Sequence, residues 1–350
     1  MKRDWLEGLI TDPSTSIWDL AKWRNGHCSP WIPLINGSSD PEEMGEAFKE
    51  RFFSFPQPPE PVLNLPGTPA PKWPFYAVTK SEVEHTIQGT SNKSAPSPSG
   101  IGYKLVKWVF AAHPDFILDI YNTAICLSHH PWTIAKIVIL SKPNKPDYSA
   151  AKAYCPVSLL ECFGKVLEKI VTNRFTFDSN LHDILPRSQF GSRPYHLATD
   201  ACTLLRYKAS TTINSGRIGG TLLFDISRFF DHLNPSFTAR VLHHLGIDDH
   251  TIAWVQDFMT RQQVSMTFNN YTTGTLEPDL GMPQGSPLSP ILSALVTSPI
   301  LHLAESWDDA NLTLYVDDGN IFASRPTYWA TADKLSKAAK QVFTWLHDSG

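Results

Sequence analysis

The chain has 350 residues and a formal net charge of −4, with 42% hydrophobic and 11% aromatic residues. This composition excludes a disordered chain and provides enough apolar surface for one extended domain or for two that share a core. No apolar run approaches the ~18 residues of a membrane span, and the N-terminus lacks the apolar stretch of a signal peptide. We therefore expect no membrane contact and an intracellular protein, in cytoplasm or nucleus. The five scattered cysteines exclude a disulfide scaffold and zinc-finger spacing.

Charge is unevenly distributed along the chain. Residues 101–220 hold 14 lysines and arginines against 8 acidic residues, whereas residues 221–350 hold 7 against 14. A basic middle followed by an acidic last third is expected where a polyanion lies next to a carboxylate metal site. Taken alone, the charges favour the simpler alternative of scatter over a solvated surface.

The first hundred residues divide into two segments. Residues 1–54 are expected to form a helical extension, whose clearest helix covers residues 41–53, where a proline and two glutamates begin an apolar helical repeat. Residues 55–100 begin with a proline-rich linker, which is expected to form no helix or strand of its own.

From residue 101 the hydrophobic pattern becomes denser. Its period predicts helices at 105–126 (interrupted near Pro114), 163–175, 198–210, 235–245, 290–302 and 331–346. Short apolar runs predict strands at 137–140, 221–224, 264–268, 312–316 and 320–323. Asp317-Asp318-Gly319 separates the last two strands and is predicted to form the tip of a hairpin.

Three aspartates stand where these strands end. Asp225 follows one apolar strand, and Asp317 and Asp318 follow another. If the strands are neighbours in one sheet, the carboxylates converge, and their repulsion would require a cation between them. Oxygen ligands with open positions suit magnesium, and two such ions would support an in-line displacement. The alternative is that the pair supplies turn residues and Asp225 caps a helix.

Several segments carry a resemblance to a known family. Leu314-Tyr315-Val316-Asp317-Asp318-Gly319 is similar to its Tyr/Phe-x-Asp-Asp signature, Phe224 to Asp231 to its first aspartate motif, and Gly281-Met282-Pro283-Gln284-Gly285-Ser286-Pro287-Leu288-Ser289-Pro290 to the motif between them. Upstream matches lie at 142–145, 156–160, 165–169 and 188–193. With these motifs in order, the chain resembles the reverse transcriptase of non-LTR (LINE-type) retrotransposons from about Trp132 onward.

The resemblance implies an α+β fold of the right-hand polymerase type, with an antiparallel palm sheet packed on helices. Fingers would begin within 55–100 and cover 101–218, and an incomplete palm would cover 219–350. The thumb would be absent, so we expect a truncated fingers–palm piece. The implied activity is RNA-directed DNA polymerisation, which joins deoxynucleoside triphosphates to a primer 3′-hydroxyl on an RNA template. It would use two Mg²⁺ ions, with Mn²⁺ as an alternative.

The family motifs also imply roles for single residues. Asp225 and Asp317 would be catalytic metal ligands with Asp318 beside them. The nucleotide-binding residues would be Phe230, Gln284, Lys142 or Lys145, and Arg228: Phe230 against the sugar, Gln284 from a rigid turn, the lysines at the triphosphate, and Arg228 as a substitute cation. The alternatives are a core phenylalanine, a turn-stabilising amide and solvated lysines, and Asp231 is expected to be structural.

The chain departs from the family pattern in two main ways. Cys155 stands where the family usually has an arginine that binds triphosphate, and the chain stops before the expected thumb. A catalytically impaired relic that keeps the fold and weak RNA binding is therefore the second hypothesis. A magnesium-dependent nuclease or phosphatase built on the same aspartates is the third.

Overall fold

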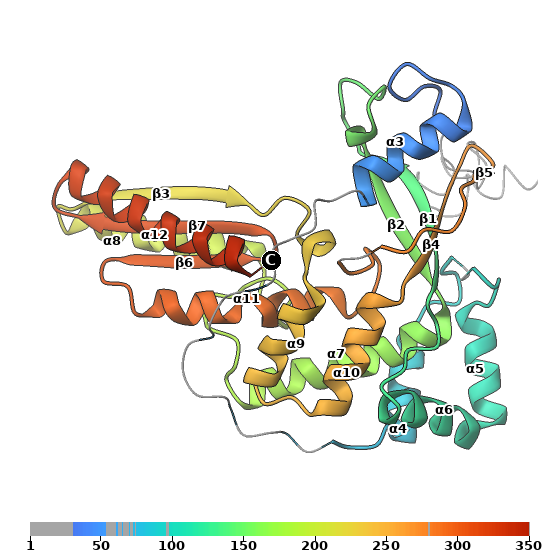
Figure 1. Cartoon of the computed structure of the whole chain (residues 1–350). Helices are drawn as coiled ribbons and strands as arrows, with labels where there is room; N and C mark the ends of the chain where they lie inside the picture. The colour runs from blue at the N-terminus through green and yellow to red at the C-terminus, as the bar shows by residue number, and fades with distance from the viewer. Residues whose placement is uncertain are drawn as a thin grey trace, which may run out of the picture. The chain divides into compact units, whose positions relative to one another are not determined.

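The computed structural model of the chain describes residues 31–53, 61, 65, 70, 73, 75–95, 98–278 and 281–349 (Figure 1). The chain divides into two compact units. The first comprises Met1–Ser54, Ile137–Val157 and Ser265–Gly274, and the second comprises the remaining residues. The helical expectation for residues 1–30 and most of the proline-rich linker lie outside the described residues.

In its described residues, the first unit holds most of a four-stranded sheet and one helix. The strand order is β2-β1-β4-β5, from β1 (Ile134–Ser141), β2 (Tyr154–Leu160), β4 (Gln263–Phe268) and β5 (Tyr271–Thr272). A 3-10 turn, η1 (Ala151–Ala153), precedes β2. The fully buried Phe48 of helix α3 (Pro41–Phe53) meets the rings of Tyr154 and Phe268 edge-on, at centroid distances of 5.5 and 5.2 Å. These aromatic contacts pack α3 on the strands.

The second unit is built on a three-stranded antiparallel sheet. Its order is β3-β7-β6, from β3 (Ile218–Asp225), β6 (Ala310–Tyr315) and β7 (Asp318–Arg325). The helices of this unit are α4 (Lys80–Gln88), α5 (Tyr103–Ala112), α6 (Pro114–Cys126), α7 (Cys162–Leu181), α8 (Ala198–Asn214), α9 (Pro235–His244), α10 (Asp249–Thr260), α11 (Ser289–Glu305) and α12 (Tyr328–Asp348), with a 3-10 turn η2 (Phe229–His232). The chain thus combines helices with sheets in an α+β arrangement.

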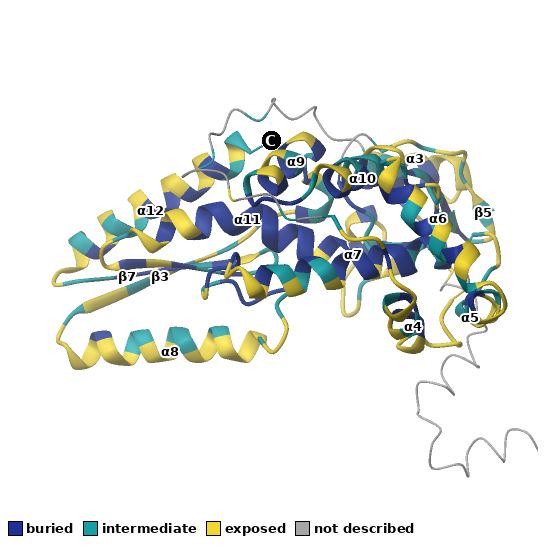
Figure 2. Cartoon of the chain, turned by 90° about the horizontal axis from the view of Figure 1, so that it is seen from below, coloured by how far each residue is buried: buried dark blue, intermediate teal, exposed yellow. Residues whose placement is uncertain are grey.

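The two faces of this sheet are covered differently (Figure 2). Helix α12 packs closely on one face, where the Phe224 and Phe343 rings meet edge-on at 5.7 Å. Helix α8 runs along the opposite face and buries only Thr212. Side chains along β3 point alternately to the two faces of the sheet. Phe224 lies on the face of α12, so Leu223 and Asp225 lie on the face along which α8 runs. Most of the surface of α8 is therefore exposed.

Helix α11 forms the centre of the second unit. Its sequence is apolar all round, and its buried residues extend from Ser289 to Ala304. A helix without a polar face is stable only when other elements surround it. Helices α7 and α9 and strand β6 pack around α11, whose buried length is visible in Figure 2.

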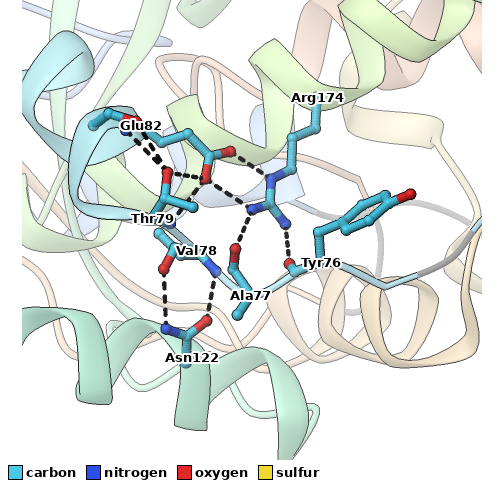
Figure 3. A network of polar contacts seen from close by, with 8 residues as sticks. Tyr76, Ala77, Val78, Thr79, Glu82, Asn122 and Arg174 are labelled. Carbon is cyan, nitrogen blue, oxygen red and sulfur yellow. Dashed lines mark hydrogen bonds and ion pairs between the residues drawn. The ribbon is translucent and has the colours of Figure 1, made fainter.

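A polar network fixes the segment before α4 (Figure 3). Arg174 of α7 donates through Nε and one terminal nitrogen to the two carboxylate oxygens of Glu82, at 2.7 and 3.0 Å. It also donates to the carbonyl oxygens of Tyr76 and Ala77. Asn122 of α6 pairs with both backbone groups of Val78. Such bidentate contacts hold a chain segment that has no regular structure of its own.

Most predicted elements are present, usually longer than predicted. The helix 105–126 divides at His113 into α5 and α6, close to the predicted interruption. The hairpin tip needs a correction, because Asp318 and Gly319 belong to strand β7 and the turn residues are Val316 and Asp317. None of the helices in the described part of the chain is long and apolar enough to cross a membrane.

Candidate active site

The three aspartates meet at one end of the β3-β7-β6 sheet. Asp225 and Asp318 are directly paired across antiparallel strands, and the amide of Ile226 donates to the carbonyl oxygen of Asp317 at 2.9 Å. Directly opposed residues in such a pair have Cβ atoms about 4.5–5.5 Å apart, on the same face of the sheet. Carboxylates from chain segments about 90 residues apart therefore share one small region.

The turn that presents Asp317 has an unfavourable backbone. Tyr315 pairs with Asp318, so Val316 and Asp317 form a two-residue turn, and Val316 has a φ of 60°. A β-branched residue in the left-handed region is strained by about 1–3 kcal/mol. The surrounding structure must hold this conformation in place.

The segment 188–191 supplies part of that support. Phe190 donates its amide to the carbonyl of Leu314 at 2.9 Å, and Leu314 donates to the carbonyl of Ser188 at 3.1 Å. A Cβ at Gly191 would lie 2.9 Å from the carbonyl carbon of Tyr315 and nearer still to the amide of Val316. Only glycine allows this approach, so the segment packs directly on the turn.

The charged form of the Asp317 carboxyl group is disfavoured at this place. Burial and the neighbouring charges of Asp318 and Asp225 raise the pKa of Asp317 above its usual value. Within the described ranges, no group of three or more His, Cys, Asp or Glu side chains is arranged to hold a metal ion. Magnesium usually takes only one or two carboxylates and completes its shell with phosphate and water. The carboxylate pair and its neighbour fit that kind of incomplete site.

Of the other predicted residues of the second unit, Gln284 lies in the turn that precedes α11, and Phe230 contacts this turn by accepting the amide of Met282. Phe230 is half-buried against the core, with its ring 5.9 Å from that of Phe229. Gln284 donates through Nε2 to Oδ1 of Asp231 at 3.1 Å. Arg228 has a φ of 54° before the turn η2. The geometry therefore links Gln284 with Asp231, a contact that the sequence did not indicate.

Lys142 and Lys145 belong to the first unit. The hydroxyl of Tyr148 donates to the carbonyl of Lys142 at 2.7 Å and accepts from the amide of Lys145 at 3.2 Å, which fixes the loop that carries both lysines. Cys155 is half-buried in β2 of the same unit. The role predicted for the lysines stays a prediction.

A groove lies between α8 and the face of the sheet that carries Asp318. Its volume is about 200 Å³, and its lining includes Cys202 and Lys208 from α8 and Leu223, Tyr315 and Asp318 from the sheet. Burial lowers the pKa of Lys208. The groove is mostly apolar and has the carboxylate of Asp318 in its lining, and the sequence motifs did not indicate it.

Comparison with known proteins identifies the family. A profile of the family described as "Reverse transcriptase (RNA-dependent DNA polymerase)" matches residues 141–350. The chain belongs to the reverse transcriptase family. The matched region covers more than half of the sequence and includes all three aspartates.

Curated relatives extend the similarity over nearly the whole chain. It is 22% identical to the RNA-directed DNA polymerase from mobile element jockey of Drosophila melanogaster, over 98% of this chain and 40% of the relative. It is 26% identical to a putative 115 kDa protein in the type-1 retrotransposable element R1DM of the same species, over 97% of this chain and 32% of the relative. The chain thus spans at most about two fifths of these relatives.

Proposed function

We propose that the chain acts as the polymerase core of an RNA-directed DNA polymerase of a non-LTR retrotransposon. The observation that carries the proposal is the pairing of Asp225 with Asp318 beside the Val316–Asp317 turn, in a chain of the reverse transcriptase family. In this proposal the β3-β7-β6 sheet with its helices is the palm, and segments before it contribute the fingers. The template is RNA, the primer is DNA, and the substrates are deoxynucleoside triphosphates.

The proposed roles of the residues follow from their positions. Asp225 and Asp317, with Asp318 beside them, would hold two Mg²⁺ ions. When bound, these ions activate the primer hydroxyl and stabilise the pyrophosphate leaving group. The half-buried ring of Phe230 would lie against the sugar and leave no space for a 2′-hydroxyl. Gln284 would face the incoming nucleotide from a turn that its contact with Asp231 stabilises.

Primer extension tests this proposal. The chain is incubated with poly(rA)/oligo(dT), deoxythymidine triphosphate and Mg²⁺ or Mn²⁺, beside an Asp317→Ala control. We expect incorporation by the wild-type chain and none above background by the control. Equal signals from both proteins, or template cleavage without synthesis, would reject the assignment, and cleavage would favour the nuclease alternative.

One observation favours a second candidate, a catalytically impaired relic. Cys155 of β2 occupies the position of the triphosphate-binding arginine of the family, and a thiol cannot make that bidentate contact. Losing such a contact could cost about 2–4 kcal/mol of transition-state stabilisation. The relic predicts RNA binding without incorporation, also after Cys155→Arg. A gain of incorporation in Cys155→Arg would instead show a working site that lacks only this cation.

A further inference from the structure

A completely buried acid lies behind the turn that presents Gln284. Glu168 is on α7, is 1% exposed, and accepts a hydrogen bond from the hydroxyl of Ser286. The same hydroxyl oxygen accepts the amide of Leu288 at 3.0 Å. Ser286 therefore connects a helix carboxyl group to the backbone at the start of α11.

The turn itself is fixed on two further sides. Ser158, in the part of β2 that belongs to the second unit, donates its amide to the carbonyl of Gln284 at 2.9 Å, and Met282 donates its amide to the carbonyl of Phe230 at 2.8 Å. Gly285 has a φ of 138°, and a Cβ there would lie 3.5 Å from the carbonyl carbon of Ser158 and nearer to its oxygen. The backbone of Gln284 is thus held tightly, and Ser286 is its anchor on the third side.

Burying a carboxyl group at this place costs desolvation free energy, which a specific interaction must offset. Burial raises the pKa of Glu168 to about 7, although the bond from Ser286 and the charge of Lys165 oppose the rise. The pKa of Tyr103 on α5 is raised to about 12, by burial first and then by the charges of Cys162 and Glu168. A buried apolar residue would pack without this desolvation cost. The hydrogen bond to Ser286 is what the carboxyl group gains.

We propose that Glu168, acting through Ser286, is a positioning residue that orients the Gln284 turn toward the incoming nucleotide. This inference rests on the proposed function, because it assumes that the turn borders the nucleotide site. Glu168 itself touches neither substrate nor metal in this proposal. It acts on the turn through one hydroxyl group.

Steady-state incorporation of a single nucleotide tests the role. For Glu168→Ala, loss of a bond to a buried hydroxyl predicts a rise of about 5- to 30-fold in KM for the nucleotide, with a smaller change in kcat. Glu168→Gln keeps an acceptor for Ser286 and should stay within about 3-fold of wild type. Ser286→Ala should reproduce the effect of Glu168→Ala, and the double variant should add little because both remove one interaction.

Thr297→Ala is the matched control. Thr297 is a buried residue of α11 whose hydroxyl donates to the carbonyl oxygens of Ser293 and Ala294 in its own helix, so its replacement leaves the bond between Glu168 and Ser286 in place. It should lower the melting temperature and leave KM unchanged. If Glu168→Ala and Thr297→Ala both lower stability and neither changes KM, Glu168 is merely structural and the proposal is wrong.

Hydrogen–deuterium exchange separates this inference from the proposed function. If the wild-type chain incorporates no nucleotide, exchange in peptides covering 282–288 still reports the turn. Glu168→Ala and Ser286→Ala should speed exchange there, whereas Glu168→Gln and Thr297→Ala should not. Unchanged exchange in Glu168→Ala overturns the proposal whether or not the chain polymerises.

Discussion

The carboxyl group of Asp317 lies close to two others and is partly removed from water, which raises its pKa. Replacing it should therefore have opposite effects on stability and on activity. Without divalent metal, Asp317→Asn removes a repulsion and should raise the melting temperature. With Mg²⁺, the wild type should gain stability and the variant less, because a ligand that binds only the folded state stabilises it.

Polymerisation by Asp317→Asn should fall at least ~100-fold, since metal-ion catalysis supplies several kcal/mol. Thermal melts with EDTA and with Mg²⁺, beside primer extension, measure both effects. Asp333→Asn is the control, because Asp333 is exposed on α12 and pairs only with Lys337 among the ion pairs of the described residues. A destabilised Asp317→Asn whose activity equals that of the control would contradict the assigned role.

Gly191 provides a second test at the residue scale. Its replacement by alanine drives a methyl group into the backbone of Tyr315 and Val316, so we expect a loss of about 1–3 kcal/mol in unfolding free energy. The same displacement should reach Asp317 and reduce polymerisation more than stability alone explains. Gly274→Ala, where no atom lies within 4 Å of the added Cβ, is the control. Denaturant melts and primer extension at a temperature where both variants are folded make the comparison.

Glu168 should make stability depend on pH in a defined direction. Its pKa is about 7 in the folded chain and near the ordinary 4.5 when unfolded. Between these values the folded state holds a proton that the unfolded state lacks, so unfolding free energy falls as pH rises from 4.5 through 7. The loss is at most about 3 kcal/mol. Glu168→Gln should remove this part of the pH dependence in melts at pH 5 and pH 8, and identical pH profiles would contradict the assignment.

At the scale of elements, the sequence predicted best where periodicity is strong. The strands at 221–224 and 312–316 and the helix at 331–346 are found as β3, β6 and α12. Helices α4 and α10 were missed, although Asp248 caps α10 by accepting the amide of Thr251, a signal that the sequence contains. The turn was placed one to two residues late, because Asp-Gly is a strong hairpin signal and local preference cannot show that Gly191 packs against Val316.

The candidate site was only partly predictable for the same reason. The motifs placed Asp225 and Asp318 at strand ends, and strand pairing then brings them together. The hydrogen bond between Glu168 and Ser286 joins residues 118 positions apart, and the lining of the α8 groove comes from both a helix and a sheet. Such contacts depend on tertiary packing, and neither periodicity nor motif spacing contains them.

The groove beside α8 leads to a prediction about that element. Cys202 is exposed and lines the groove together with Asp318. A bulky thiol reagent such as N-ethylmaleimide at this position should obstruct the face that carries the aspartates and abolish most incorporation. Cys202→Ser should resist the reagent, whereas Cys126→Ser, which removes an exposed cysteine of α6, should remain sensitive. Equal inhibition of the two variants would show that α8 is remote from the substrate path.

At the scale of the whole molecule, the basic segment 101–220 should bind RNA mainly through phosphate contacts. If about four phosphates are neutralised, the slope of log affinity against log salt is near −3 for single strands, and affinity falls about 50-fold between 50 and 200 mM salt.

Reversing two exposed charges, Arg187→Glu with Arg206→Glu, should weaken binding and flatten the slope by about 1.4. Lys337→Glu with Lys340→Glu makes the same change in net charge on α12 of the acidic last third and should alter binding much less. Fluorescence anisotropy with a labelled RNA measures both slopes. Equal effects from the two double variants would mean that net charge alone, rather than the basic segment, governs RNA affinity.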